Sequence, residues 1–319
     1  MRKIAYLATA AGLILFISLM AHKGVAEIMA ALSVGGWNLL WVVAYYLVPM
    51  ALSTLGWYGL ISRKSHPPIL VLLWARWTGE SFNTLLPVAQ VGGHVVRAQL
   101  VTRHGVTKTE AGATVMVDFT LGVVIQFVFA LMGTLLLFRR KGGGEEITGL
   151  LMGIAIGAFL LLAFYATQRI GLFSRVARFI QAMVRGRELV SLAGGTKALD
   201  QKIEAIYQRH GDVLFCSGWR LLSWIAKTGE SWLALYFLGV PVTFSEALIM
   251  ESLSAAVGSA AFLIPGALGV KEGGIMVIGN FIGISPEVAL ALALVKRVRE
   301  LLIGIPGLIT WLVAEGHRI

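Results

Sequence analysis

Apolar residues run in long stretches along this chain, separated by shorter polar segments. Six stretches approach the roughly 20 residues that a helix needs to cross a bilayer, namely residues 4–21, 37–61, 112–138, 147–166, 213–239 and 286–314. They do not alternate apolar with polar residues, as the strands of a membrane barrel would. The pattern predicts an all-α polytopic membrane protein with six full spans, folded as a single transmembrane domain over residues 1–319.

Two further apolar stretches, residues 69–101 and 247–283, are broken in their middle by Pro87 and Pro265. Each is too short for two full spans and too interrupted for one. Irregular backbone at membrane depth has to be buried in protein or line a cavity. We therefore predict that each stretch forms a re-entrant hairpin of two half-helices, which enters and leaves the membrane on the same face.

The order span, hairpin, span occurs twice, over residues 37–138 and residues 213–314, and the two units have the same length. Counting the spans between them gives the units opposite orientations in the membrane. This arrangement is typical of inverted-topology repeats, in which a substrate site forms near the bilayer midplane between broken helices.

The polar segment 167–212 carries eight lysines and arginines against four acidic residues. Basic loops remain in the cytoplasm, so this linker is expected there, and counting outward from it puts both termini in the cytoplasm too. Apolar residues recur at helical spacing in its first half, which predicts either an amphipathic helix on the lipid surface or a solvated helix. The net charge of +10 belongs with such loops, and we expect no nucleic-acid partner.

Polar residues of the first hairpin follow one helix face, since Arg76, Glu80, Asn83 and Pro87 have i, i+4, i+7, i+11 spacing. A charge at membrane depth is costly unless it is paired or hydrated. Arg76 and Glu80 could neutralise each other, but the same face also presents Asn83. Two interpretations remain: a structural ion pair that attaches the hairpin to its neighbours, or one wall of a polar cavity.

The pair Gly92–Gly93 suggests a use for the break itself. A half-helix that begins near Gly93 turns free N–H groups and its positive dipole end into the break, which favours an anion such as a phosphate. Arg97 adds positive charge one turn later. The alternative is that Arg97 extends to the cytoplasmic interface.

The second hairpin has a similar composition. Pro265 and Gly266 end one half-helix, and Lys271 and Glu272 open the next. Further charges stand inside predicted spans, namely Asp118, Arg220, Lys227, Glu230 and Arg297. Each could be a buried structural pair, but charges from so many elements favour a water-filled polar cavity.

The sequence gives no sign of a cofactor. A single cysteine, scattered histidines and the absence of a phosphate-binding loop motif argue against a disulfide, a metal site and nucleotide use. We expect no cofactor and no enzymatic activity.

The motifs GESFNTLLPVAQVGGHVVRAQL (79–100) and FLIPGALGVKEGG (262–274), with the arginine of ALALVKRVRELL, resemble the transmembrane domain of lysylphosphatidylglycerol synthases, a flippase-like family. The resemblance covers nearly the whole chain. Length and the MRK start also resemble the hopanoid-biosynthesis-associated membrane protein subfamily. The soluble aminoacyl-transferase domain of the full synthases is lacking, so lipid modification is not expected.

The resemblance implies translocation of a lipid across the bacterial inner membrane: an aminoacylated phospholipid, a lipid-linked sugar or a hopanoid-related lipid. Membrane lipids are then the expected partners, and lipid-synthesis enzymes a further class of partner. We expect Arg97 and Lys271 to bind an anionic headgroup between the hairpin tips. Glu80, Asp118, Glu230 and Glu272 would bind cationic groups or exchange protons.

Two other functions stay open. One is an intramembrane lipid-modifying enzyme, for which His94 and Asp118 are the plausible pair of catalytic groups. The other is a non-catalytic partner of a lipid-synthesis complex. The lipid, the direction of transport, the coupling ion and the oligomeric state are not predicted by the sequence.

Overall fold

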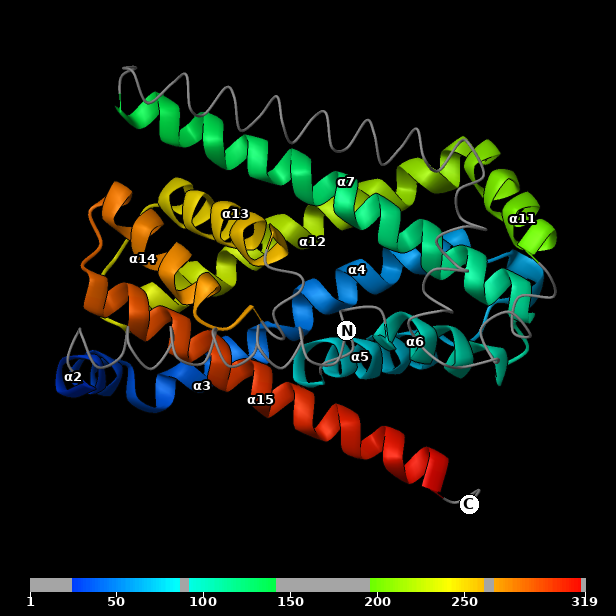
Figure 1. The fold of residues 1–319 in the computed structure, drawn as a ribbon, viewed down its shortest axis with the longest axis horizontal. Coiled ribbons are helices and arrows are strands. Elements are labelled where there is room, and N and C mark those ends of the chain that lie inside the picture. The colour runs from blue at the N-terminus through cyan, green and yellow to red at the C-terminus, as the bar shows by residue number, and fades with distance from the viewer. Residues whose placement is uncertain (1–24, 87–91, 142–195, 261–266, 317–319) are drawn as a thin grey trace, which may run out of the picture.

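The described part of the chain is entirely helical. A computed structural model describes residues 25–86, 92–141, 196–260 and 267–316, and no strand occurs among them (Figure 1). The elements are α2 Val25–Gly35, η1 Gly36–Asn38, α3 Leu39–Tyr45, α4 Leu47–Leu60, η2 Arg63–Ser65, α5 Ile69–Leu85, α6 Gly92–Thr102, α7 Lys108–Lys141, α11 Thr196–Gln208, α12 His210–Phe237, α13 Phe244–Ala260, α14 Val270–Ile282 and α15 Pro286–Gly316. The predicted all-α class is confirmed.

Four of the predicted spans correspond to described helices. Residues 37–61 form the end of η1 together with α3 and α4. The spans at 112–138 and 286–314 lie within α7 and α15, and the span at 213–239 corresponds to α12, which ends at Phe237. The spans at 4–21 and 147–166 lie outside the described residues. By length and composition, Leu32–Leu60 and Lys108–Arg140 are long and apolar enough to cross a membrane.

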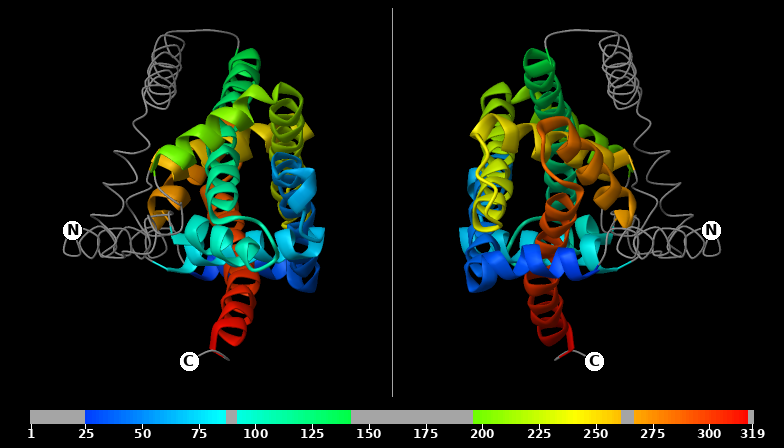
Figure 2. Two further views of the ribbon diagram at one scale, coloured as in Figure 1. Left: turned by 90° about the vertical axis from the view of Figure 1, so that its right-hand side faces the viewer. Right: turned by 90° about the vertical axis from the view of Figure 1, so that its left-hand side faces the viewer.

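Side chains are distributed as expected for a protein surrounded by lipid. Large apolar residues are exposed along the outer faces of the long helices, among them Leu135 on α7 at 58% and Leu312 on α15 at 58%. Charged residues are buried between the helices, including Arg76 and Asp118. A soluble protein shows the opposite preference for charge. The C-terminal end of α15 extends beyond the other described helices (Figure 2).

Each of the two broken stretches forms a pair of short helices. α5 packs against α6 and α13 against α14. α5 has 17 residues and α6 has 11, so at 1.5 Å per residue they are about 26 Å and 17 Å long, less than a bilayer core of about 30 Å. Pro87, Pro265 and Gly266 lie outside the described residues. The turn before α14 has Ala267 at φ 49° and Gly269 at φ 74°.

Only glycines fit where α5 crosses α6. A Cβ on Gly93 would lie 1.9 Å from the backbone oxygen of Gly79, and one on Gly79 would lie 2.6 Å from the oxygen of Gly93. Next to this contact, the N–H of Gly93 donates a hydrogen bond to Oδ1 of Asn83 at 2.8 Å. Asn83 therefore satisfies a donor at the start of α6, and its side chain fixes how the two helices meet.

Gly93→Ala should therefore destabilise the protein. The methyl group would collide with backbone, which cannot rotate away as a side chain can, so a loss of about 1–3 kcal/mol is expected. Thermal unfolding of the purified protein in detergent measures this loss. The control is Gly218→Ala on α12, where a Cβ meets nothing within 4 Å, and alanine should there stabilise the helix by about 0.5–1 kcal/mol. Equal midpoints for the two variants would contradict the close crossing.

The last part of the basic linker folds onto the protein. α11 packs against α7, and Ile203 and Ile206 join a buried cluster with Ala113 and Val117 of that helix. This part of the linker therefore covers the protein with its apolar face. The first half, where a surface helix was predicted, lies outside the described residues.

Candidate functional site

Three arginines meet at one buried carboxylate. Asp118 on α7 has no exposed surface. Its Oδ2 lies 2.7 Å from Nη2 of Arg97 and 3.0 Å from Nη2 of Arg76. Arg220 of α12 donates from Nε to Oδ1 at 3.0 Å, and its Nη2 lies 2.7 Å from Oδ2. This arginine cluster joins α5, α6 and α12 to α7.

An aromatic ring adds to the charge balance of the arginine cluster. The guanidinium carbon of Arg97 lies 4.2 Å from the centre of the Trp57 ring, and that of Arg76 lies 5.7 Å away. Arg76 also donates to the backbone oxygen of Ser53 at 2.9 Å. Since one carboxylate faces three guanidinium groups, the attraction to the ring face offsets part of the excess positive charge.

The structure decides between the alternatives that the sequence left open for these residues, and the structural ion pair that attaches the hairpin to its neighbours is formed. Arg76 pairs with Asp118 and not with Glu80, whose Oε2 accepts a hydrogen bond from the Tyr46 hydroxyl at 3.2 Å. Arg97 does not extend to the interface, because it is 3% exposed and turns inward to Asp118. Asp118, which stands alone in its stretch of sequence, is the centre of the cluster.

A second set of charges connects α12, α13, α14 and α15. The ion pairs of this network are Lys271–Glu300 at 2.7 Å, Arg297–Glu300 at 2.8 Å, Arg297–Glu272 at 2.7 Å, Arg299–Glu230 at 2.9 Å, and Lys296–Glu251. Four of its members come from one stretch of α15, Lys296 to Glu300. None of their side chains is more than 23% exposed, and each carboxylate has a cation within ion-pair distance.

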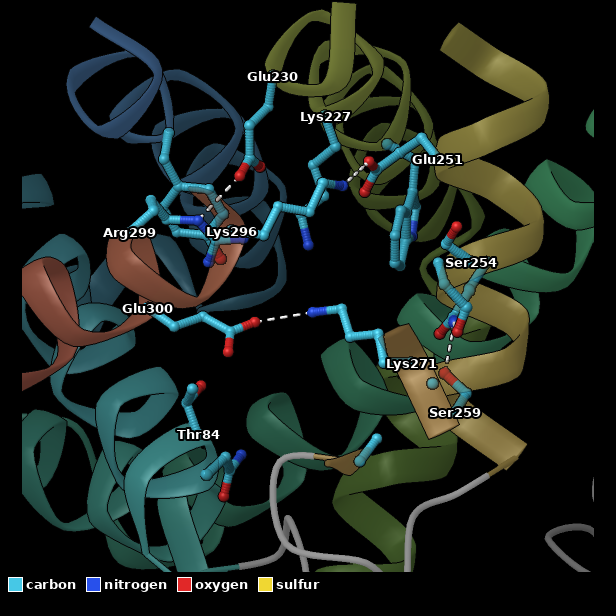
Figure 3. A pocket seen from close by; sticks show the side chains of 17 residues that line it. Thr84, Lys227, Glu230, Glu251, Ser254, Ser259, Lys271, Lys296, Arg299 and Glu300 are labelled. Atoms are coloured by element: carbon cyan, nitrogen blue, oxygen red, sulfur yellow. Dashed lines mark hydrogen bonds and ion pairs between the residues drawn. The ribbon is translucent and has the colours of Figure 1, made fainter. Parts of the chain in front are cut away.

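A cavity of about 310 Å³ opens beside this network (Figure 3). The charged side chains in its wall are Lys227, Glu230, Glu251, Lys271, Lys296, Arg299 and Glu300, and the polar ones include Tyr46, Asn83, Thr84, Gln126, Ser254 and Ser259. They come from both halves of the chain, because α5 and α7 contribute as well as α12, α13, α14 and α15. The cavity can therefore hold a charged, hydrogen-bonding group in the interior of the helix bundle.

The structure does not bring all the predicted site residues together. Asn83, Lys227, Glu230 and Lys271 line the cavity. Glu272 and Arg297 belong to the ion-pair network without lining the cavity, while Arg76, Arg97 and Asp118 form the arginine cluster. Gly92 and Gly93 begin α6, and Glu80 contacts Tyr46.

The expected joint anion site of Arg97 and Lys271 is not formed. Arg97 is bound to Asp118, and Lys271 is bound to Glu300 in the other charged region. The N–H of Gly93, expected to face an anion, donates to Asn83 instead.

Several residues of the site were missed by reasoning from the sequence. Glu251 looks interfacial by its place near the start of an apolar stretch, yet it is 7% exposed and pairs with Lys296. Arg299 is covered by the Tyr46 ring, 4.0 Å from its guanidinium carbon. The run of charges at 296–300 within an apolar stretch could have predicted these buried pairs, but only Arg297 was proposed from it as a site residue.

Comparison with known proteins agrees with this architecture. Residues 3–307 match the family described as the lysylphosphatidylglycerol synthase TM region. The chain belongs to this family. Neither the curated proteins nor the solved structures include a match to it.

Membership of the lysylphosphatidylglycerol synthase TM family confirms the resemblance expected from the two motifs, and it identifies the chain as a transmembrane protein with a lipid-related function. The family match does not reach the level of the hopanoid-associated subfamily, which stays a prediction.

Proposed function

We propose that this protein is a lipid translocase of the bacterial inner membrane, which moves a lipid with a polar or charged headgroup across the bilayer without changing it chemically. The observation that supports this most is the charged cavity of about 310 Å³ inside a member of a transmembrane family. A headgroup cannot cross hydrocarbon without losing its hydration. The cavity offers it ion pairs and hydroxyl groups instead, while the acyl chains stay among the exposed apolar residues outside.

Helix packing supports an inverted repeat as the basis for such movement. α4 packs against α12, the first helices of the two predicted units, and α5 packs against α15 as α13 packs against α7. In each of the latter two contacts, the first hairpin helix of one unit packs against the last helix of the other unit. A two-fold axis that relates the two units produces such a pair of equivalent contacts. In translocases built this way, the repeats move relative to each other around a fixed site.

Two ion pairs take nearly equivalent places in the proposed repeats with their signs exchanged. Arg76 on α5 binds Asp118 on α7, and Glu251 on α13 binds Lys296 on α15. Counted from the starts of the units, the members correspond to within two residues. Each pair joins the first hairpin helix of a unit to the last helix of that unit, so we propose that each fixes its hairpin in one position.

We further propose that residues 69–101 and 247–283 are re-entrant, and that both termini lie in the cytoplasm. Without a nucleotide-binding motif in the sequence, the driving force would be an ion gradient or the lipid's own concentration difference. Membrane lipids are the proposed partners, and lipid-synthesis enzymes the proposed source of the substrate.

Transport can be measured in proteoliposomes that contain phosphatidylglycerol labelled with a fluorophore on its acyl chain, so that the headgroup is unchanged. Dithionite destroys fluorescence in the outer leaflet only, so continued loss reports translocation. Wild-type protein should produce this loss. Gly258→Phe should lower the rate at least about tenfold, the effect of about 1.4 kcal/mol of lost binding. Gly258 lines the cavity, and a Cβ there meets only the Lys271 side chain, at 4.0 Å.

Gly218→Phe is the matched control, since it adds the same ring to an exposed helical glycine away from the cavity. It should transport like wild type. The assay is repeated with aminoacylated phosphatidylglycerol and with a lipid-linked sugar. If the wild-type protein causes no continued loss of fluorescence with any of the three lipids, the proposed translocation is wrong. If Gly258→Phe transports normally, the cavity is not on the path.

A further inference from the structure

Lys227 differs from the other charged residues of the cavity because its ammonium group has no ionic partner. No hydrogen bond or ion pair joins it to any described residue, and the carboxylates of Glu80, Glu251 and Glu230 attract it only from a longer distance. Two aromatic rings lie beside it. Nζ lies 4.3 Å from the centre of the Trp224 ring and 6.0 Å from that of Tyr46. The side chain of Lys227 comes from α12 and lines the cavity beside Lys296 and Glu251 (Figure 3), and the ion pair of Glu251 is with Lys296.

The other charges in the cavity wall cancel in pairs. Lys271 binds Glu300, Lys296 binds Glu251 and Arg299 binds Glu230. Lys227 is therefore the one lining cation left over among the described residues. Glu80 is the acidic residue whose charge acts most strongly on Lys227, but it does not line the cavity, and its carboxylate accepts a hydrogen bond from the Tyr46 hydroxyl.

A ligand with a single negative charge would complete this arrangement. A lone ammonium inside a bundle is costly unless an anion or water satisfies its three donors. Charge-assisted hydrogen bonds to oxygen anions are roughly twice as strong as neutral ones. The neighbouring hydroxyl and amide groups of Thr84, Ser254 and Gln126 could bind the remaining polar atoms of such a ligand.

We propose that the cavity binds a phosphodiester monoanion, the linking group of a phospholipid headgroup, and that Lys227 is the residue that binds its charge. This inference rests on the proposed function for the choice of a lipid, and it adds the chemical class of the recognised group. The aromatic rings of Trp224 and Tyr46 hold the ammonium in place before the ligand arrives.

The test is lipid binding, measured without transport by native mass spectrometry of the intact protein in mild detergent. The probes are short-chain phosphatidylglycerol and diacylglycerol with the same chains but no phosphate. Wild type should bind phosphatidylglycerol at least about tenfold more tightly than diacylglycerol. Lys227→Gln should remove most of that preference, and Lys227→Arg should keep it. Lys202→Gln, which alters a lysine of α11 that is 39% exposed, should behave like wild type.

Competition with free glycerophosphoglycerol, which is the headgroup phosphodiester without acyl chains, then distinguishes the source of the anion. Displacement at millimolar concentration means that the anion alone is recognised, and no displacement means that the complete lipid is required; both agree with a phosphodiester site. Equal binding of the two lipids by wild type would overturn the proposal, and this comparison does not depend on a variant that folds. A Lys227→Gln variant that binds phosphatidylglycerol as tightly as wild type would also overturn the proposal.

The binding and transport experiments can fail separately. If wild type binds phosphatidylglycerol through Lys227 but moves no lipid, the anion site is supported and the proposed translocation is wrong. If wild type moves lipid but binds phosphatidylglycerol no more tightly than diacylglycerol, translocation is supported and the anion site is wrong.

Discussion

Asp118→Asn should cause the largest loss of stability of any single charge removal in this protein. Asparagine has nearly the same shape as aspartate but no charge, so Arg76, Arg97 and Arg220 would lose their shared counter-ion inside the bundle. Breaking one buried pair costs about 3–5 kcal/mol, and here three cations lose one partner. We expect little monodisperse protein after extraction and a strongly lowered thermal midpoint.

Asp212→Asn is the matched control for this result. Asp212 also pairs with an arginine, Arg209 at 2.8 Å, but the two side chains are 40% and 37% exposed. Exposed pairs contribute about 0–1 kcal/mol, so this variant should be close to wild type. If both aspartate variants unfold at the same temperature, the arginine cluster does not hold α5, α6, α7 and α12 together.

Glu251→Gln should produce the second largest loss, and a second substitution should reverse it. The single change leaves Lys296 as an uncompensated buried cation, at an expected cost of about 3–5 kcal/mol. Adding Lys296→Gln removes that charge, and replacing both members of a buried pair is often close to neutral. The double variant should therefore unfold near the wild-type temperature.

The control for the glutamate is Glu204→Gln on the exposed side of α11, where surface substitutions stay within about 0.5 kcal/mol. A double variant as unstable as Glu251→Gln alone would show that the two side chains contribute independently. The pair would then not be what joins α13 to α15.

The same double variant separates stability from transport. If the Glu251–Lys296 pair fixes the second hairpin in one position, its removal should change the rate of lipid movement even though the fold is kept.

The helices could be predicted from the sequence because their signal is local. Apolar stretches about 20 residues long and interruptions by proline and glycine depend only on neighbouring residues. The start of α6 at Gly92 and of α14 at Val270 therefore agrees with the predicted half-helix starts near Gly93 and Lys271.

The ion pairs could not be predicted in this way. The partners of Asp118 stand 42, 21 and 102 residues away along the chain. Sequence spacing favoured Arg76 with Glu80, because i, i+4 neighbours share a helix face. Asp118 competes better for that arginine because it is fully buried and the folded chain brings it within 3.0 Å.

Buried charge consequently has two uses in this protein. The arginine cluster is largely buried and holds helices together, whereas the ion-pair network borders a cavity in which Lys227 has no ion-pair partner among the described residues. The sequence alone presents both as charges in apolar stretches. Their difference lies in the space beside them, which depends on the packing of six helices.

A structure of the protein in lipid nanodiscs containing phosphatidylglycerol tests the central claim most directly. We predict headgroup density in the cavity, with a phosphate oxygen within hydrogen-bond distance of the Lys227 ammonium group. Lipid bound only along the outer apolar faces, with nothing but water beside Lys227, would contradict the account.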